Sequence, residues 1–223
     1  MAYVELARVS SDRGDLVLRQ RTSATGPSVL ELRANGVFVM DSAETATEQA
    51  LATAALELCE DPRDVLVGGL GLGYTMHAVL GDQRVERIVV AELEAPVIDW
   101  MRDGTVPHGP TFLADERIRI ENVDVALLVI EARDASYDLV LMDTDNGPGN
   151  LVHAHNAELY QANFLGEVRR VLAPGGAIAV WSSHASNDLL AALGHHFDDV
   201  QPVPCEVELQ GRQEIYWLHL GRA

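Results

Sequence analysis

The sequence contains no lysine: its 16 basic residues are all arginine, and 34 aspartate and glutamate residues give a formal net charge of −18. Without lysine the chain can form no Schiff base with a carbonyl substrate or pyridoxal cofactor, and it lacks a P-loop lysine for nucleotide phosphates. An acidic surface repels phosphate backbones and anionic lipid headgroups, so we expect neither nucleic acid nor a membrane as partner. A small molecule, such as an amine, fits better, although coding bias or adaptation to salt explains the acidity equally well.

Cysteine and long apolar runs are also scarce. Cys59 and Cys205 are the only cysteines, and neither belongs to a C-x-x-C motif, so neither a disulfide framework nor a zinc ribbon is indicated. No apolar stretch approaches the ~20 residues that span a bilayer. Residues 1–15 carry charges throughout and contain no apolar segment of a signal peptide. These absences predict a soluble, cytoplasmic protein.

The first 43 residues have the pattern of a small antiparallel β appendage. Four short runs of β-branched and apolar residues alternate with turn residues, and Asn35-Gly36 is a strong hairpin signal. The predicted strands cover residues 3–9, 16–21, 29–33 and 37–40. Because exposed strand edges need pairing or protection, we also expect a homodimer.

Residues 44–223 alternate between strand-like and helix-like segments. The predicted strands cover residues 65–67, 87–91, 118–121, 139–142, 177–181, 200–207 and 214–220. The predicted helices cover residues 44–58, 74–80, 96–101, 124–132, 157–172 and 187–195. This alternation predicts an α/β domain with a doubly wound, mainly parallel seven-stranded sheet and an antiparallel C-terminal hairpin. Ligands bind such sheets beyond the carboxyl ends of the strands.

A glycine loop follows the first strand of this domain. Gly69, Gly71 and Gly73 let the backbone turn tightly and approach a ligand, while the following helix offers free N–H groups. Their G-x-G-x-G spacing does not match the G-x-G-x-x-G/A fingerprint of dinucleotide-binding proteins, which argues against NAD. A purely structural tight turn is the alternative.

Acidic residues follow three of the later strands. Glu92 lies where a carboxylate can accept the ribose hydroxyls of an adenosine. Asp124 could accept an adenine amino group or simply cap a helix. Asp143, with Asp145 and Asn146, could bind a cation, take a proton or hold a metal, although the segment also suits a turn.

Two histidines lie beyond this acidic segment. His153 and His155 are second candidates for a base, after Asp143, because an unperturbed histidine side chain titrates near neutrality. A His-x-His pair with no third ligand at a defined spacing is a weak metal signal, so we predict no metal site.

The order of these motifs resembles the class I S-adenosylmethionine-dependent transferases, and most closely the spermidine synthase (polyamine aminopropyltransferase) family. The resemblance extends from about residue 16 to residue 181. It implies a Rossmann-like class I methyltransferase fold in which the three glycines line the sulfonium tail of the cofactor. It further implies that Glu92 holds the ribose, Asp124 the adenine and Asp143 the reaction centre. The residues beside these, which we expect to contact the cofactor, are Leu70, Leu93 and Val125.

Several positions depart from the family pattern. The glycine loop of the family contains an aspartate that holds the ammonium group of decarboxylated S-adenosylmethionine, and this chain has Leu72 there. The second aspartate of the D-S-S-D-P motif becomes Asn146, with an additional acid at Asp145. Where family members carry a Tyr-Gln pair before the first core helix, this chain reads Thr47-Glu48-Gln49, so the glutamine is retained as Gln49 and the tyrosine is lost.

These departures favour ordinary S-adenosylmethionine and methyl transfer to a small-molecule nucleophile, because a buried ammonium group without a counterion is unfavourable. Aminopropyl transfer from decarboxylated S-adenosylmethionine is the alternative, since Glu48, Asp143 and Asp145 could form a cation site by another route. A non-catalytic adenosyl-binding protein is a third hypothesis. The predicted substrate contacts are Glu48, Gln49, Asp145, Asn146, His153 and His155, and Asp143 is the predicted catalytic residue.

Overall fold

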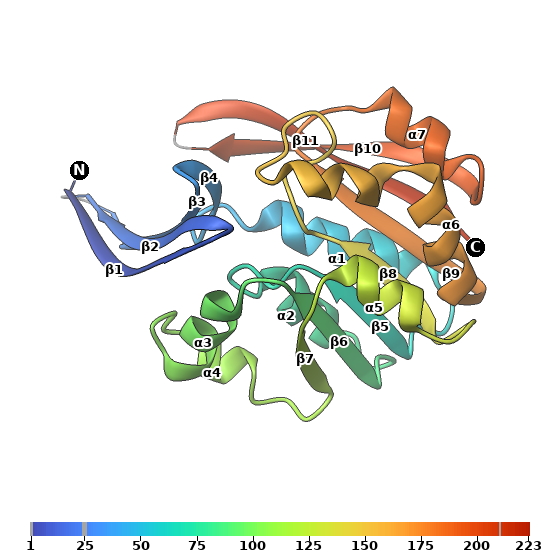
Figure 1. The fold of residues 1–223 in the computed structure, drawn as a ribbon, viewed down its shortest axis with the longest axis horizontal. Helices are drawn as coiled ribbons and strands as arrows, with labels where there is room; N and C mark the ends of the chain where they lie inside the picture. Colours follow the sequence, from blue (N-terminus) through green and yellow to red (C-terminus); the bar gives the residue numbers. More distant parts are fainter. Residues whose placement is uncertain (1, 24–25, 210) are drawn as a thin grey trace.

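The chain forms two β-sheets, seen in the computed structural model, which describes residues 2–23, 26–209 and 211–223. The first is antiparallel, with its strands in chain order, and lies at one end of the molecule (Figure 1). Its strands are β1 (Ala2–Ser11), β2 (Gly14–Thr22), β3 (Val29–Ala34) and β4 (Val37–Asp41). Asn35 and Gly36, between β3 and β4, have φ values of 54° and 76°, which is the backbone that a tight hairpin turn requires.

The second sheet has seven strands in the order β10-β11-β9-β8-β5-β6-β7. The five strands from β9 to β7 are parallel, and β11 and β10 run antiparallel at one edge. The strands are β5 (Asp64–Gly68), β6 (Arg87–Glu92), β7 (Ile118–Asn122), β8 (Tyr137–Met142), β9 (Leu172–Ser182), β10 (Asp198–Leu209) and β11 (Arg212–Arg222). The topology switches direction between β5 and β8, where such sheets bind ligands.

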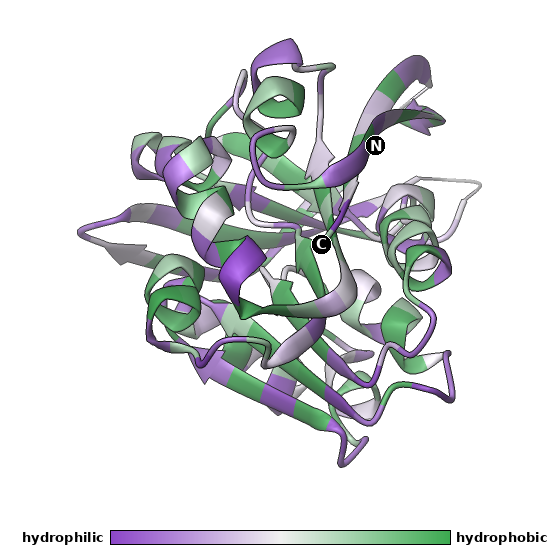
Figure 2. Ribbon diagram, turned by 90° about the vertical axis from the view of Figure 1, so that its right-hand side faces the viewer, coloured by the Kyte–Doolittle hydropathy of each residue, from purple (hydrophilic) through white to green (hydrophobic). Residues whose placement is uncertain are grey.

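Helices cover both faces of this sheet. On β5, Val65 and Val67 pack into one buried cluster and Leu66 into another, because successive side chains point to opposite faces. The first cluster contains residues of α1 (Ala46–Leu58), α2 (Tyr74–Leu80) and α3 (Ala95–Asp103), and α4 (Gly109–Phe112) packs beside it. The second contains residues of α5 (Val125–Glu131), α6 (Ala162–Val171) and α7 (Asn187–Leu193). Figure 2 shows mostly hydrophobic residues on the innermost strands.

The small sheet shares the first core cluster. Leu16, Leu18 and Leu32 are buried in it together with Leu51 of α1. The last strand of the small sheet ends at Asp41, and α1 begins at Ala46. The expected boundary between residues 1–43 and 44–223 falls between these two elements, and the division of the chain into two domains stays a prediction. Within the described ranges, no helix has the length and apolar character needed to cross a membrane.

The predicted fold class is confirmed, with two differences in the helices. The helix expected over residues 157–172 is instead a 3₁₀ helix, η1 (Ala154–Tyr160), followed by α6. Gln161 separates them, since its extended backbone (φ −94°, ψ 151°) cannot continue a helix. The four-residue helix α4 was not predicted, because it is too short to show a periodic pattern.

Candidate active site

A cavity of about 150 Å³ opens beyond the carboxyl ends of the parallel strands. The loop after β5 contributes Gly69 and Gly71, the end of β6 contributes Glu92, and the segment after β8 contributes Asp143. The small N-terminal sheet forms another wall, through Leu16, Leu32, Ala34, Val39 and Met40. The site therefore needs both sheets, although the sequence signals for it lie in the larger one.

Two glycines allow the loop to approach its neighbours closely. Gly69 has φ +95°, and a Cβ atom there would lie 2.1 Å from the carbonyl oxygen of Asp143. Gly71 has φ +50°, and a Cβ atom there would lie 2.6 Å from Sδ of Met40. Any side chain would displace these neighbours, so glycine at both positions shapes the cavity wall.

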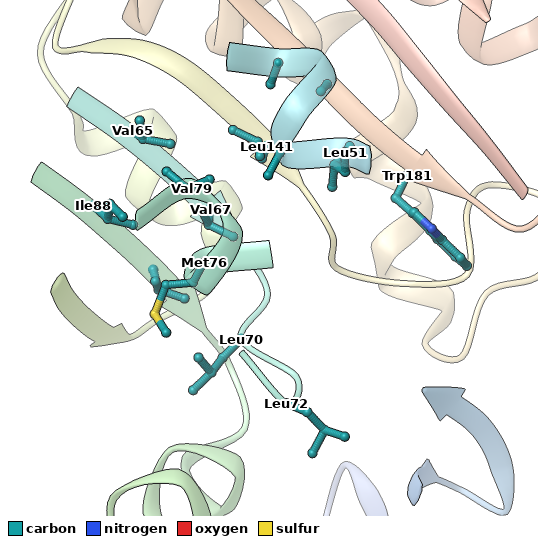
Figure 3. Close-up of a cluster of buried hydrophobic side chains, with 14 of the residues drawn as sticks. Leu51, Val65, Val67, Leu70, Leu72, Met76, Val79, Ile88, Leu141 and Trp181 are labelled. Carbon is teal, nitrogen blue, oxygen red and sulfur yellow. The ribbon is translucent and has the colours of Figure 1, made fainter. Parts of the chain in front are cut away.

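The rest of the loop points away from the cavity. Leu70 and Leu72 are 5% and 1% exposed and belong to the apolar cluster drawn in Figure 3. Gly73 caps α2 and packs near Met101. Of the predicted cofactor contacts, Leu70 and Gly73 therefore do not line the cavity, because the turn that presents Gly69 and Gly71 places their neighbours against the core.

Glu92 ends β6 with its carboxylate held by backbone donors. The N–H of Leu70 donates to Oε2 at 2.9 Å, and the N–H of Glu94 donates to Oε1 at 2.7 Å. Burial raises the pKa of Glu92 despite these bonds. Each carboxylate oxygen can accept a further hydrogen bond, so this fixed side chain can accept hydrogen bonds from the hydroxyl groups of a ligand in the cavity.

Asp124 combines the two roles that its sequence position suggests. Its Oδ1 accepts a 2.8 Å bond from the N–H of Ala126 and caps α5. It also lines the cavity, as do the predicted contacts Leu93 and Val125. The helix cap therefore does not remove Asp124 from the site.

Asp143 follows β8, is partly buried and lines the cavity. The hydroxyl of Thr75, in the first turn of α2, donates to its Oδ2 at 2.6 Å. Burial raises the pKa of Asp143 to about 6, and the Thr75 bond opposes that change. Thr75 carries no recognisable sequence signal apart from its place after the glycine loop.

Glu48, in the first turn of α1, lies beside Asp143. Its side chain is buried, and the hydroxyl of Thr47 donates to its Oε2 at 2.9 Å. Burial and the charge of Asp143 raise the pKa of Glu48 to about 8. Two interacting acids titrate as a pair, so near neutral pH the pair carries fewer than two negative charges unless a cation approaches.

A second cavity, of about 230 Å³, adjoins the first. The residues that line both are Val39, Met40, Glu48, Asn146 and Trp181. The second cavity also has Phe38 and Tyr216 on its wall, and the rings of Tyr216 and Trp181 pack edge to face with centroids 4.9 Å apart. Its remaining acidic residues are Asp41 and Glu44. Aromatic faces and carboxylates together suit a cationic group.

Asp145 does not supply the free charge that its sequence position suggested. Its Oδ1 accepts bonds of 2.7 Å from the N–H groups of Asn146 and Val152. Its Oδ2 accepts from the N–H of His153 at 3.2 Å and from Nδ2 of Asn156 at 2.7 Å. Asp145 lines the first cavity, but its carboxylate organises the loop around these four donors.

The other predicted substrate residues divide between the cavities and the surface. Asn146 lines both cavities and His153 lines the first. Gln49 is exposed outside them, because one helical step turns it away from Glu48, and its Nε2 donates to Oγ1 of Thr45. His155 is exposed on η1, also outside the cavities.

One wall residue comes from the turn between β1 and β2. Arg13 lines the first cavity, and its Nε donates to Oε1 of Glu94 at 2.6 Å. The two residues are 81 positions apart in the chain. No local sequence pattern indicates this contact, since only the packing of the small sheet brings them together.

Comparisons with known proteins agree on one family. The model of the spermine/spermidine synthase domain matches residues 44–191. Spermidine synthase 1 of Pisum sativum is 30% identical over 172 residues, which cover 75% of this chain and 48% of that protein. Putrescine N-methyltransferase 3 of Nicotiana tabacum is 28% identical over 120 residues, covering 53% of this chain and 29% of that protein. The chain thus spans about half the length of the pea protein.

The fold has counterparts among solved structures. A crystal structure of spermidine synthase in complex with the transition-state analogue AdoDATO superposes with a TM-score of 0.84. The match covers 98% of this chain and 73% of that one, at 16% sequence identity. The architecture of both sheets is therefore shared, while most side chains differ.

Proposed function

Because this chain belongs to the spermine/spermidine synthase family, we propose that it transfers an aminopropyl group from decarboxylated S-adenosylmethionine to an amine. The donor occupies the first cavity and the acceptor the second. Glu92 receives the ribose hydroxyls, Asp124 the adenine amino group, and Leu93 and Val125 flank the ring. The sulfonium tail lies along Gly69 and Gly71 and ends near Asp143.

The observation that carries this proposal is the pair of neighbouring carboxylates of Glu48 and Asp143: the buried Glu48 lines both cavities, and the partly buried Asp143 lines the first. Buried acids without a cationic partner are unfavourable, and the raised pKa values express that cost. A donor with an ammonium tail, or an amine acceptor, supplies the missing positive charge. The pair therefore suits cations better than it suits the carboxylate of ordinary S-adenosylmethionine.

The position of Glu48 removes the reason for which the sequence favoured methyl transfer. That argument rested on Leu72, which leaves the glycine loop without a counterion for the donor ammonium. In the folded chain Leu72 is in the core, and α1 provides Glu48 as a carboxylate from another element. The preference between the two reactions is accordingly reversed, and aminopropyl transfer takes first place.

The chemistry is an in-line displacement. The amine nitrogen attacks the propyl carbon next to sulfur, a C–N bond forms as the C–S bond breaks, and sulfur keeps the electron pair in neutral 5′-methylthioadenosine. The chain needs to orient the two reactants, exclude water and receive the proton that the acceptor ammonium must lose. Loop glycines, the walls of the small sheet and the carboxylate pair suit these tasks.

Methyl transfer to an amine is the second candidate. It is favoured by Leu72 and by the similarity to a putrescine N-methyltransferase. Both reactions need an amine acceptor, but their adenosyl products differ: aminopropyl transfer leaves 5′-methylthioadenosine, whereas methyl transfer leaves S-adenosylhomocysteine.

The deciding experiment incubates the full chain with either donor and a panel of diamines and polyamines, and measures the adenosyl products by mass spectrometry. Formation of 5′-methylthioadenosine from the decarboxylated donor is the expected result. Formation of S-adenosylhomocysteine alone would replace the first candidate by the second. Donor binding in calorimetry without any product would favour a non-catalytic adenosyl-binding protein.

A further inference from the structure

Among the residues that the structure describes, Glu48 is the only carboxylate that lines both cavities. Of the five residues that line both cavities, only Glu48 can gain or lose a proton near neutral pH. The other four present apolar, amide or indole groups. A side chain that lines both cavities can contact an acceptor amine bound in the second cavity where that amine approaches an aminopropyl donor bound in the first.

We infer that Glu48 is the catalytic base that takes the proton from the acceptor ammonium group, an assignment that rests on the proposed transfer to an amine. Thr47 engages Oε2 and fixes the carboxylate in the first turn of α1. Oε1 of Glu48 is then the atom that receives the proton of the amine.

The neighbouring acids are less suited to this role. Asp143 lines only the first cavity, and its Oδ2 is engaged by Thr75 at 2.6 Å. Asp145 already accepts four hydrogen bonds within its own loop. Asp41 lines only the second cavity and pairs with Arg21 at 3.1 Å. Asp143 is then the group that orients the donor, with its charge helping Glu48 to hold a proton.

The titration of Glu48 depends on several neighbours. Burial has the largest effect on its pKa, followed by Asp143, which comes directly after β8, and Glu44, which precedes α1, acts in the same direction. The other ionisable groups that face this region are Asp41 and its partner Arg21 from the small sheet, Tyr74 from α2 and Tyr216 from β11. The raised pKa makes Glu48 a stronger base than an exposed carboxylate, and therefore better matched to an ammonium group.

The proton balance of the step is simple. The acceptor enters as an ammonium ion, the Glu48 carboxylate takes one proton, and the freed nitrogen lone pair forms the new C–N bond while the C–S electron pair moves to sulfur. The protonated Glu48 then returns its proton to water. Because Glu48 must be ionised to act, kcat/KM should rise with pH across the range in which the ligand-free pair loses its proton.

The test compares Glu48→Gln, Glu48→Asp and Glu57→Gln with the wild type. Glu57 is an exposed residue of the same helix outside both cavities, so Glu57→Gln makes the same chemical change away from the site. The measurements are kcat/KM for 5′-methylthioadenosine formation from pH 6 to pH 9.5, and the affinity for 5′-methylthioadenosine by calorimetry. Bound 5′-methylthioadenosine also reports that each variant is folded.

We expect Glu48→Gln to lower kcat/KM by about 10²–10⁴-fold at pH 8 and to lose the rise with pH. Glu48→Asp should recover part of the activity, and Glu57→Gln should match the wild type. Affinity for 5′-methylthioadenosine should change little in all three. An acceptor amine with a pKa below 7 arrives unprotonated, so it should lose much less activity in Glu48→Gln, which a purely structural role would not produce.

Two failures are distinguishable. An active wild type with a Glu48→Gln variant that keeps its activity and pH profile would overturn the role of Glu48 alone. A Glu48→Gln variant equally impaired with protonated and unprotonated amines would also overturn it. A wild type that binds 5′-methylthioadenosine but forms no product with any amine would overturn the proposed transfer itself.

Discussion

The hydroxyl of Thr75 donates a 2.6 Å hydrogen bond to Oδ2 of Asp143 and joins the first turn of α2 to the end of β8. The bond opposes the effect of burial, which raises the pKa of Asp143. It therefore keeps Asp143 ionised beside Glu48 over more of the neutral pH range.

Replacing Thr75 by valine should raise the pKa of Asp143 further and lower the catalytic activity. A hydrogen bond to a charged group contributes about 1.5–3 kcal/mol, so we expect a loss of about 10- to 100-fold in kcat/KM at pH 7. Thr75→Ser keeps the hydroxyl and serves as the control. Steady-state kinetics of both variants across pH test this, and equal losses in the two would contradict it.

The pair of Arg13 and Glu94 should matter for ligand binding more than for folding. Arg13 is 40% exposed, and exposed ion pairs contribute only about 0–1 kcal/mol to stability. Because Arg13 forms part of the cavity wall, Arg13→Ala should weaken 5′-methylthioadenosine binding several-fold with little change in Tm. Arg8→Ala is the control, since Arg8 pairs with Glu5 and Asp15 on the same hairpin outside the cavity. Calorimetry giving equal affinities for both variants would refute the prediction.

The stability of the ligand-free protein should depend on pH through Glu48. Its pKa rises from 4.5 to about 8 on folding, so the folded chain binds more protons than the unfolded chain between these values. The contribution of Glu48 to stability is therefore highest in acid and is lost as the pH rises. Glu48→Gln should stabilise the protein by roughly 1–3 kcal/mol at pH 8 and by little at pH 5. Urea denaturation at both pH values measures this, and a gain that is independent of pH would refute it.

His219 should make the stability of the protein depend on pH in the opposite direction to Glu48. It is buried on β11, and burial lowers its pKa from 6.5 to about 4. The unfolded chain then binds more protons between these values, so the contribution of His219 is lost as the pH falls below 6.5. When the pH falls from 7 to 5, the free energy of unfolding of the wild type should decrease by up to about 2 kcal/mol more than that of His219→Leu. Thermal denaturation tests this against His195→Gln, an exposed control that should behave like the wild type.

The homodimer stays a prediction, and β1 is the edge that could form it. This edge strand exposes Tyr3, Val4 and Leu6 at 48%, 53% and 40%, and such edges pair readily with another strand. Light scattering should give twice the 24.2 kDa mass of one chain, and a Val4→Glu, Leu6→Glu variant should give the single mass. A monomeric wild type would rule out the dimer.

The sequence determined the order of the elements and the position of the ligand site along the sheet. Apolar strands, glycine turns and helix periodicity are local signals, so the alternation of strands and helices could be predicted from residues 44–223. Glu92, Asp124 and Asp143 could be placed together because the carboxyl ends of parallel strands meet at one edge. Gly69 and Gly71 were found because only glycine suits their backbone and close contacts.

Only the tertiary structure decided which polar groups face one another and which carry a free charge. Glu48 lies beside Asp143 because α1 packs against the sheet, and Arg13 reaches Glu94 because the small sheet packs on the large one. Asp145 is engaged by four donors that a local pattern does not reveal. Burial and the charges of residues distant in the chain set a pKa, so the acid–base properties of this site arise only when the two sheets and α1 come together.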